Sequence, residues 1–274
     1  MIAYFTRAPA HAFWDEHWAG HSVQELLWTA RRSPLTGLIE AALPGRGRIL
    51  EAGCGLGQYV LLLRGRGHDA VGVDASVEAL RKCRKDSPAT PLAAMDLRAL
   101  GLRPAVFATY VSLGVVEHDP EGPDAILREA WRVLEPGGVL VLSVPYVNAV
   151  RRLGAWWIRR GSRRIREAGG AFHQFAFSCW EARAFVERNG FRVLTVHPYD
   201  PARLLRGWVR RMRGSVRSRS APSSQESGGA PGPSATGPRA LLARVVRRLL
   251  YTPPMLRLLG HMILLVAAKR SDGS

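Results

Sequence analysis

Residues 48–57 read RILEAGCGLG, and this stretch decides the fold. The apolar residues Ile49 and Leu50 predict a short buried strand, and a helical stretch follows Gly57. A glycine-rich turn between a strand and a helix presents backbone N–H groups to a ligand at the carboxyl edge of the strand. Glycine is favoured there because a Cβ atom would block the close approach of that ligand. A nicotinamide-binding turn would carry glycine where this chain has Gln58, so the spacing disfavours a dehydrogenase.

The rest of the chain alternates short apolar runs with helical stretches, which is typical of βαβ units and a parallel sheet. Ser76 stands where the N-cap of a helix is expected, and Gly137-Gly138 ends a helix and turns the chain into an apolar strand. The sequence therefore predicts an α/β protein. We expect its strands at residues 48–52, 69–74, 90–94, 106–113, 138–145, 191–197 and 261–268.

The turn Glu51–Gly57 resembles the first motif of the class I S-adenosylmethionine (SAM)-dependent methyltransferases, an acid followed by three alternating glycines. Arg132–Gly138 is similar to the helix and turn that precede the fifth strand of that family. The resemblance covers about residues 45–200, with one departure at Ala108, where many relatives carry aspartate. It implies a Rossmann-like three-layer sandwich around a seven-stranded, mainly parallel sheet whose last strand is antiparallel. Within the family, the chain is similar to the small-molecule methyltransferases of ubiquinone and menaquinone biosynthesis.

The same resemblance implies SAM as the cofactor and places its site at the carboxyl ends of the first strands. Asp74 falls where these enzymes hold the ribose, and one carboxylate can accept hydrogen bonds from both ribose hydroxyls. Asp96 falls at the adenine site, and Glu51 would fix the amino group of the cofactor or merely favour the start of the following helix. The implied cofactor-binding residues are Glu51, Gly53, Cys54, Gly55, Gly57, Asp74, Ala75, Asp96, Leu97 and Leu113.

Methyl transfer from a sulfonium needs little covalent help, because the site mainly aligns the acceptor with the methyl carbon. A base matters only if the acceptor is protonated. His118 follows the fourth strand, beside the donor in this family, and is the candidate catalytic base. The alternative is that His118 only hydrogen-bonds backbone or shapes the pocket. The candidate substrate residues are Trp18, Tyr146, Trp156 and His173, of which Tyr146 and His173 are also weaker candidates for the base.

We expect residues 1–44 to form a helical cap over the cofactor domain at 45–200. A lid near residues 150–170 carries Trp156 and Trp157 among seven arginines. Aromatic rings among arginines suit an isoprenoid or acyl lipid with a phosphate head, or a nucleobase, although a plain substrate lid explains them equally well. Residues 201–260 are expected to form a basic, partly disordered insertion, and residues 261–270 the final strand. Within the insertion, residues 241–251 predict an amphipathic helix.

The net charge of +17 is confined to the second half of the chain. Residues 1–150 hold 15 Lys and Arg against 16 Asp and Glu, whereas residues 151–274 hold 24 against 6. A basic surface of this kind can bind nucleic acid, anionic lipid or an acidic substrate. A GC-rich codon bias, which favours arginine, is an alternative explanation of the excess charge. The helix at 241–251 can pack its apolar face on the sheet or lie on a membrane surface.

Three scattered cysteines, Cys54, Cys83 and Cys179, predict neither a disulfide framework nor a zinc site, so we expect a cytoplasmic protein without a metal. The N-terminus lacks the pattern of a secretory signal, and no apolar run reaches the roughly 20 residues that span a bilayer. The expected function is methyl transfer from SAM to a small-molecule or lipid-linked acceptor. Two alternatives are an RNA or DNA methyltransferase, for which no base-handling motif is present, and a non-catalytic SAM-binding protein at the membrane periphery.

Overall fold

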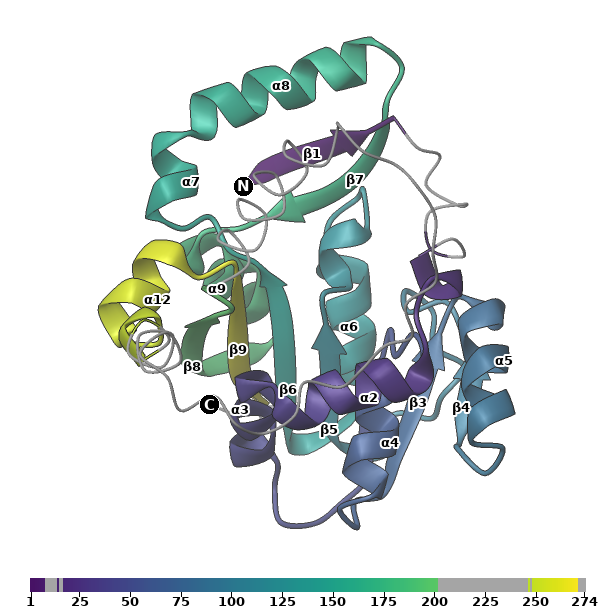
Figure 1. The fold of residues 1–274 in the computed structure, drawn as a ribbon. Coiled ribbons are helices and arrows are strands. Elements are labelled where there is room, and N and C mark those ends of the chain that lie inside the picture. The colour runs from purple at the N-terminus through teal and green to yellow at the C-terminus, as the bar shows by residue number, and fades with distance from the viewer. Residues whose placement is uncertain (8–13, 15–16, 202–245, 247, 271–274) are drawn as a thin grey trace, which may run out of the picture.

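A computed structural model describes residues 1–7, 14, 17–201, 246 and 248–270 (Figure 1). Its main sheet has seven strands in the order β4-β3-β2-β5-β6-β9-β8. The strands are β2 (Ile49–Ala52), β3 (Ala70–Asp74), β4 (Leu92–Ala94), β5 (Phe107–Leu113), β6 (Leu134–Pro145), β8 (Phe191–Tyr199) and β9 (Met262–Lys269). Strand β9 runs antiparallel to both of its neighbours, whereas the other six strands share one direction. The predicted mainly parallel sheet with an antiparallel last strand is confirmed.

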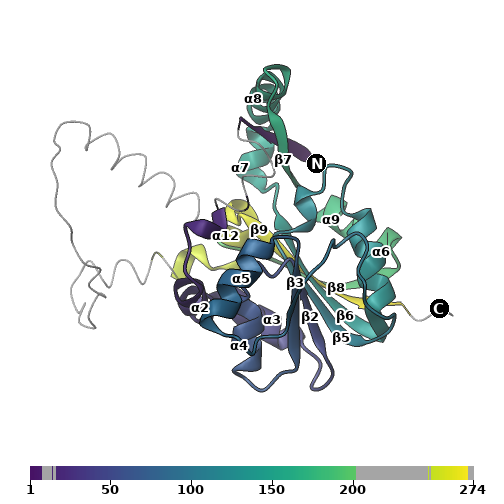
Figure 2. The same cartoon turned by 90° about the vertical axis from the view of Figure 1, so that its right-hand side faces the viewer.

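Helices cover both faces of this sheet and complete the three-layer sandwich (Figure 2). One face carries α2 (Val23–Arg32), α3 (Pro34–Ala42), α4 (Gln58–Arg64) and α5 (Val77–Asp86). The other face carries α6 (Asp124–Val133) and α9 (Cys179–Arg188). The predicted N-cap of α5 is confirmed, because the Ser76 side chain accepts a hydrogen bond from the backbone N–H of Ala79.

The two helical layers bury two separate apolar cores against the sheet. Along β6, Leu140 and Leu142 lie in the core beneath α6 and α9, whereas Val141 lies in the core beneath α2 to α5. Successive side chains of a strand point to opposite faces, so a strand that is buried on both faces needs a continuous apolar run. This requirement explains why the sequence revealed these strands.

A second sheet of two strands lies beyond the carboxyl end of β6. Strand β1 (Ile2–Thr6) pairs antiparallel with β7 (Ala171–Ala176), and α8 (Ala155–Glu167) packs on β1 (Figure 1). A short helix, α7 (Ala149–Leu153), leads from β6 into α8. The predicted helical cap at residues 1–44 is therefore wrong for residues 2–6, which form β1. The hydrogen-bonding partner of β1 lies some 170 residues away in the sequence, and a local pattern does not reveal it.

Beyond β8, α12 (Pro253–Leu259) contacts α7 and β8. Most of the predicted basic insertion at 201–260 lies outside the described residues, as does most of the amphipathic helix predicted at 241–251. Within that helix, residues 246 and 248–250 are described and are helical. Among the described residues, no helix is long and apolar enough to cross a membrane.

Candidate cofactor and acceptor site

The glycine turn between β2 and α4 has the shape that the sequence predicts. Gly53, Gly55 and Gly57 have φ angles of +79°, +52° and +70°, in the left-handed region that disfavours residues with a Cβ atom. A Cβ atom on Gly53 would collide with the Val115 side chain, and one on Gly55 would lie 2.5 Å from the Trp18 ring. The turn is therefore a cradle that only glycine can form.

Asp74, the last residue of β3, is hydrogen-bonded to this turn. Its Oδ2 accepts a hydrogen bond from the backbone N–H of Gly55 at 2.7 Å, and its Oδ1 accepts one from that of Ser76 at 2.8 Å. Burial raises the pKa of the Asp74 carboxyl, and these backbone hydrogen bonds oppose the rise. The structure thus brings Asp74 and the glycine turn together at neighbouring strand ends, with Ala75 exposed beside them.

Glu51 lies in the interior, below the turn. Its side chain is 2% exposed, and its Oε2 has no hydrogen-bond partner among the described residues. Burial raises the pKa of Glu51 to about 8 against an opposing hydrogen bond from the backbone of Val60, so the carboxyl is mostly neutral at pH 7. Burial also raises the pKa of the Cys54 thiol, which makes that cysteine an inert part of the turn.

The predicted adenine-site residues follow β4. Asp96 is exposed, and its carboxylate is held by the Arg98 guanidinium, whose Nη2 lies 2.8 Å from Oδ2. Hydrogen bonds from Arg98 lower the pKa of Asp96, so the carboxylate stays ionised. Leu97 is buried, and Leu113 lies half-buried at the end of β5. An adenine amino group would share Asp96 with Arg98, a neighbour that the sequence reading did not consider.

His118 ends a single 3-10 turn, η1 (Val116–His118), directly after β5. Its Nδ1 lies 2.7 Å from the backbone carbonyl oxygen of His173 on β7, which fixes the proton on Nδ1 and leaves Nε2 as a hydrogen-bond acceptor. The Trp14 ring meets the imidazole edge-on at 4.7 Å, and the His173 ring lies 5.3 Å away. Burial lowers the pKa of His118 to about 4, so the imidazole is neutral at physiological pH.

Glu117 is a feature of this site that the sequence reading missed. The side chain is buried, its Oε2 has no partner among the described residues, and its Oε1 lies 4.0 Å from Nε2 of His118. Burial raises the pKa of Glu117 to about 8. The available signal was an acid that directly follows the apolar run of β5 and Gly114-Val115-Val116.

The raised pKa of Glu117 predicts how Glu117→Gln changes stability with pH. Between pH 4.5 and about 8 only the unfolded chain ionises this group, so its contribution to stability is full below 4.5 and is lost as the pH rises through 8. Glutamine resembles the neutral acid at every pH. From pH 5 to 8 the Tm of the variant is therefore expected to gain about 2 °C per pH unit over that of the wild type.

Differential scanning calorimetry across this pH range measures the difference directly. Glu121→Gln is the matched control, because Glu121 is exposed on the loop that follows η1 and its replacement makes the same acid-to-amide change outside the interior. A difference in Tm between Glu117→Gln and the wild type that stays constant from pH 5 to 8 would contradict the prediction.

The candidate substrate residues are only partly brought together. The Trp18 ring covers Gly55, and its backbone carbonyl accepts a hydrogen bond from Nζ of Lys82. Tyr146 is half-buried at the end of β6, and burial raises its pKa to about 12. Trp156, by contrast, is 59% exposed on α8, where its ring lies 4.5 Å from that of Trp157. The structure therefore joins Trp18 and His173 to the site and leaves Trp156 on the outer surface.

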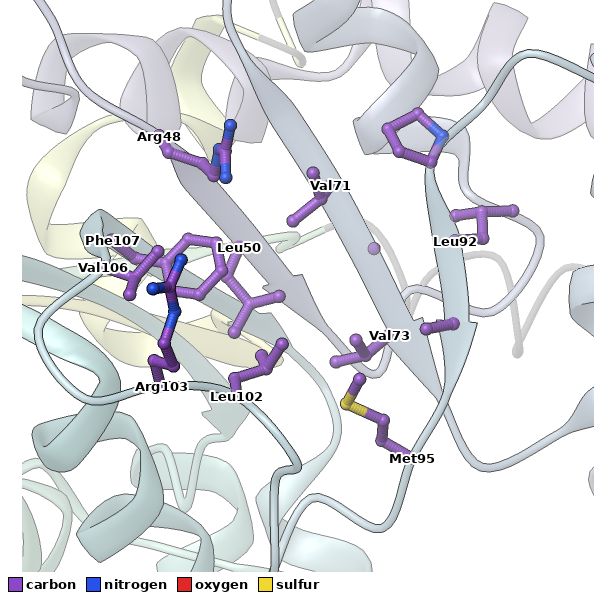
Figure 3. A pocket seen from close by; sticks show the side chains of 13 residues that line it. Arg48, Leu50, Val71, Val73, Leu92, Met95, Leu102, Arg103, Val106 and Phe107 are labelled. Atoms are coloured by element: carbon purple, nitrogen blue, oxygen red, sulfur yellow. The ribbon is translucent and has the colours of Figure 1, made fainter.

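A hollow of about 350 Å³ lies on the face of the sheet that carries α6 and α9 (Figure 3). Leu50 of β2, Val71 and Val73 of β3, and Met95 and Leu102 of the segment after β4 line it. That segment forms no helix between residues 95 and 106, although helices were expected in most of the gaps between strands, and it leaves part of this face uncovered. None of the predicted cofactor-binding residues lines this hollow.

Comparison with known proteins finds similarity to methyltransferases in the part of the chain that contains the glycine turn. Residues 50–142 match the family described as the methyltransferase domain. The malonyl-[acyl-carrier protein] O-methyltransferase of Erwinia pyrifoliae is 33% identical over 125 residues, 45% of this chain and 47% of that protein. The trans-aconitate 2-methyltransferase of Azoarcus sp. is 35% identical over 143 residues, 47% of this chain and 54% of that protein. The chain spans about half the length of the curated relatives it matches.

The fold extends over more of the chain than the sequence match. A SAM-dependent methyltransferase structure from Archaeoglobus fulgidus superposes with a TM-score of 0.56 at 16% identity, over 95% of this chain and all of that one. The matched segment contains the glycine turn, Asp74, Asp96 and His118, but not His173 or the second sheet. Residues 50–142 thus match a methyltransferase domain, and the chain has the fold of a SAM-dependent methyltransferase structure.

Proposed function

We propose that the whole chain is a SAM-dependent methyltransferase that acts on a small-molecule or lipid-linked acceptor. The observation that carries the proposal is the glycine cradle hydrogen-bonded to Asp74 at the carboxyl ends of β2 and β3. SAM supplies an activated methyl group when it is bound, so the chain has to hold the donor and align the acceptor. In this proposal Asp74 accepts hydrogen bonds from the ribose and Asp96 binds the adenine. Glu51 fixes the amino group of the cofactor.

His118 is proposed as the group that handles a proton of the acceptor. Its Nδ1–H is held by the carbonyl oxygen of His173, so Nε2 points its lone pair away from that bond and can accept a hydrogen bond from an acceptor O–H or N–H. The lowered pKa keeps this lone pair free over the physiological range. An acceptor that reacts as a carboxylate would need no base, and His118 would then only position it.

The acceptor is proposed to be an acid or a lipid-linked molecule. Two relatives are named for malonyl-[acyl-carrier protein] and trans-aconitate, whose acceptor groups are carboxylic acids. The basic second half of the chain favours an anionic acceptor of either kind. The resemblance to the ubiquinone and menaquinone methyltransferases favours a lipid tail, which would bring the chain to a membrane surface. All three cysteines are free, which supports the proposed cytoplasmic location.

Two measurements test this function in sequence. Isothermal titration calorimetry with SAM and with S-adenosylhomocysteine is expected to give dissociation constants below about 1 mM, and no heat at that concentration would overturn the proposal. Isotopically labelled SAM, incubated with the protein and a cell extract, should then label an acceptor that mass spectrometry identifies. Binding without any labelled product would overturn methyl transfer while leaving the cofactor site intact.

A further inference from the structure

Apolar side chains gather on the outer surface of α7 and α8 instead of packing inside. Leu153 is 88% exposed and Trp157 72% exposed, and Val150 and Trp156 beside them are also exposed. The opposite side of α8 packs on β1, through Ala155 and Ile158. The exposed aromatic rings are thus not needed to hold α8 in place. Single exposed apolar residues are ordinary, but a large cluster of this kind marks an interaction site.

Arginines surround this cluster. Residues 149–167 contain seven arginines and a single acid, Glu167. Among the described residues, the recorded ion pair within this segment is that of Arg163 with Glu167. No acidic side chain of the described chain pairs with Arg159, and the Arg160 guanidinium lies over the Trp156 ring at 5.5 Å. The surface therefore combines exposed apolar rings with uncompensated positive charge.

We propose that this docking surface, formed by Leu153, Trp156, Trp157, Arg152, Arg159 and Arg160, binds the anionic headgroup surface of a membrane. Tryptophan is favoured at the boundary between headgroups and acyl chains, where its ring is buried and its N–H finds a partner. Arginine stems lie along apolar surface while the guanidinium groups reach lipid phosphates. This inference goes beyond the proposed methyl transfer and does not depend on it.

A nucleic acid is the other polyanion that such a surface could meet, and the aliphatic residues argue against it. Bases would stack on the tryptophan rings, but Leu153 and Val150 would stay in contact with water or phosphate. At a bilayer the same two side chains enter the acyl boundary together with the rings. Helix α12, which contacts α7, also carries the exposed residues Leu258 and Arg257.

The position of the docking surface also suits a membrane-bound acceptor. Strand β6 ends at Pro145 and α7 begins at Ala149, so the surface lies at the carboxyl end of the sheet, as the glycine turn does (Figure 1). A chain docked through α7 and α8 would hold this end of the sheet near the headgroups.

Vesicle flotation of the full chain tests the proposal, with phosphatidylcholine vesicles that contain or lack phosphatidylglycerol. We expect binding only to the anionic vesicles, and we expect Arg159→Gln combined with Arg160→Gln to weaken it by about thirtyfold, because each arginine near an anionic surface contributes about a factor of five. The matched control is Arg31→Gln with Arg32→Gln, another exposed arginine pair, in the last turn of α2, which should bind as the wild type does.

Quenching of tryptophan fluorescence by brominated lipids reports on the rings themselves. Trp156→Ala with Trp157→Ala should remove the quenching, whereas Trp180→Ala, a control at a residue 77% exposed on α9, should leave it intact. Equal binding to neutral and anionic vesicles would overturn the proposal, as would equal effects of the α8 variants and their controls. Absence of vesicle binding, together with tight binding of a single-stranded oligonucleotide that the α8 variants abolish, would overturn it in favour of nucleic acid.

Discussion

Asp74→Ala is expected to weaken the binding of S-adenosylhomocysteine by about 100-fold, because two hydrogen bonds to a charged acceptor contribute roughly 3 kcal/mol together. The carboxylate sits where the glycine turn meets the end of β3, and burial leaves it few other partners. No neutral side chain offers two acceptor oxygens in one plane to both ribose hydroxyls. Isothermal titration calorimetry measures the change as a ratio of dissociation constants.

The turn itself also depends on Asp74, so binding has to be separated from folding. The carboxylate accepts the backbone N–H groups of Gly55 and Ser76, and the alanine variant leaves both without that partner. Asp74→Asn keeps one acceptor oxygen and should retain more of the fold while still losing about tenfold in affinity. Asp69→Ala, which removes an exposed ion pair with Arg48, should bind as the wild type does. Affinity of a folded Asp74→Ala variant within threefold of the wild type would refute the ribose assignment.

His118→Ala is expected to lower kcat by about 100-fold when the acceptor loses a proton, because positioned bases contribute at least that factor. The affinity for S-adenosylhomocysteine should change little, since the contacts recorded for His118 are to His173, Glu117 and Trp14 rather than to the turn. His68→Ala, in the loop before β3, is the matched control. The assay uses the acceptor that the labelled extract identifies. An unchanged kcat would assign His118 to shaping the pocket alone.

The lowered pKa of His118 also fixes where the acid limb of the pH profile lies. A base with a pKa of about 4 is lost only as the pH falls through 4, so this group leaves the rate flat from pH 6 to 8. An acid limb with its midpoint near 6.5, the ordinary pKa of histidine, would mean that the His118 imidazole is less buried in solution than in this structure.

The sequence predicted the main sheet and the glycine turn well. Strands such as β6 are buried on both faces and therefore appear as continuous apolar runs. The glycine turn has positive φ angles, and the three glycines in the sequence predict them because glycine adopts such angles without strain. Asp74 could be placed because the carboxyl ends of neighbouring parallel strands meet at one edge. The hydrogen bond between Asp74 and the backbone N–H of Gly55 joins the ends of these two strands.

The region around β1, β7 and α8 was less predictable because distant segments build it. Strand β1 exists through its pairing with β7, and the imidazole of His118 is fixed by a carbonyl oxygen of the same β7 strand. The outward position of Trp156 follows from which side of α8 packs on β1, and a tryptophan among arginines does not reveal that side. Glu117 was overlooked because an isolated acid after an apolar run is usually a solvated loop residue.

The place of β9 in the sheet has a consequence for synthesis on the ribosome. Residues 262–269 are made after every other strand, yet they lie between β6 and β8, and β8 has no other partner in the sheet. Until β9 emerges, the nascent chain carries an open edge on β6 and an unattached β8, both of which invite pairing with other chains. Completion of the sheet thus waits for β9, the strand of this sheet that is made last.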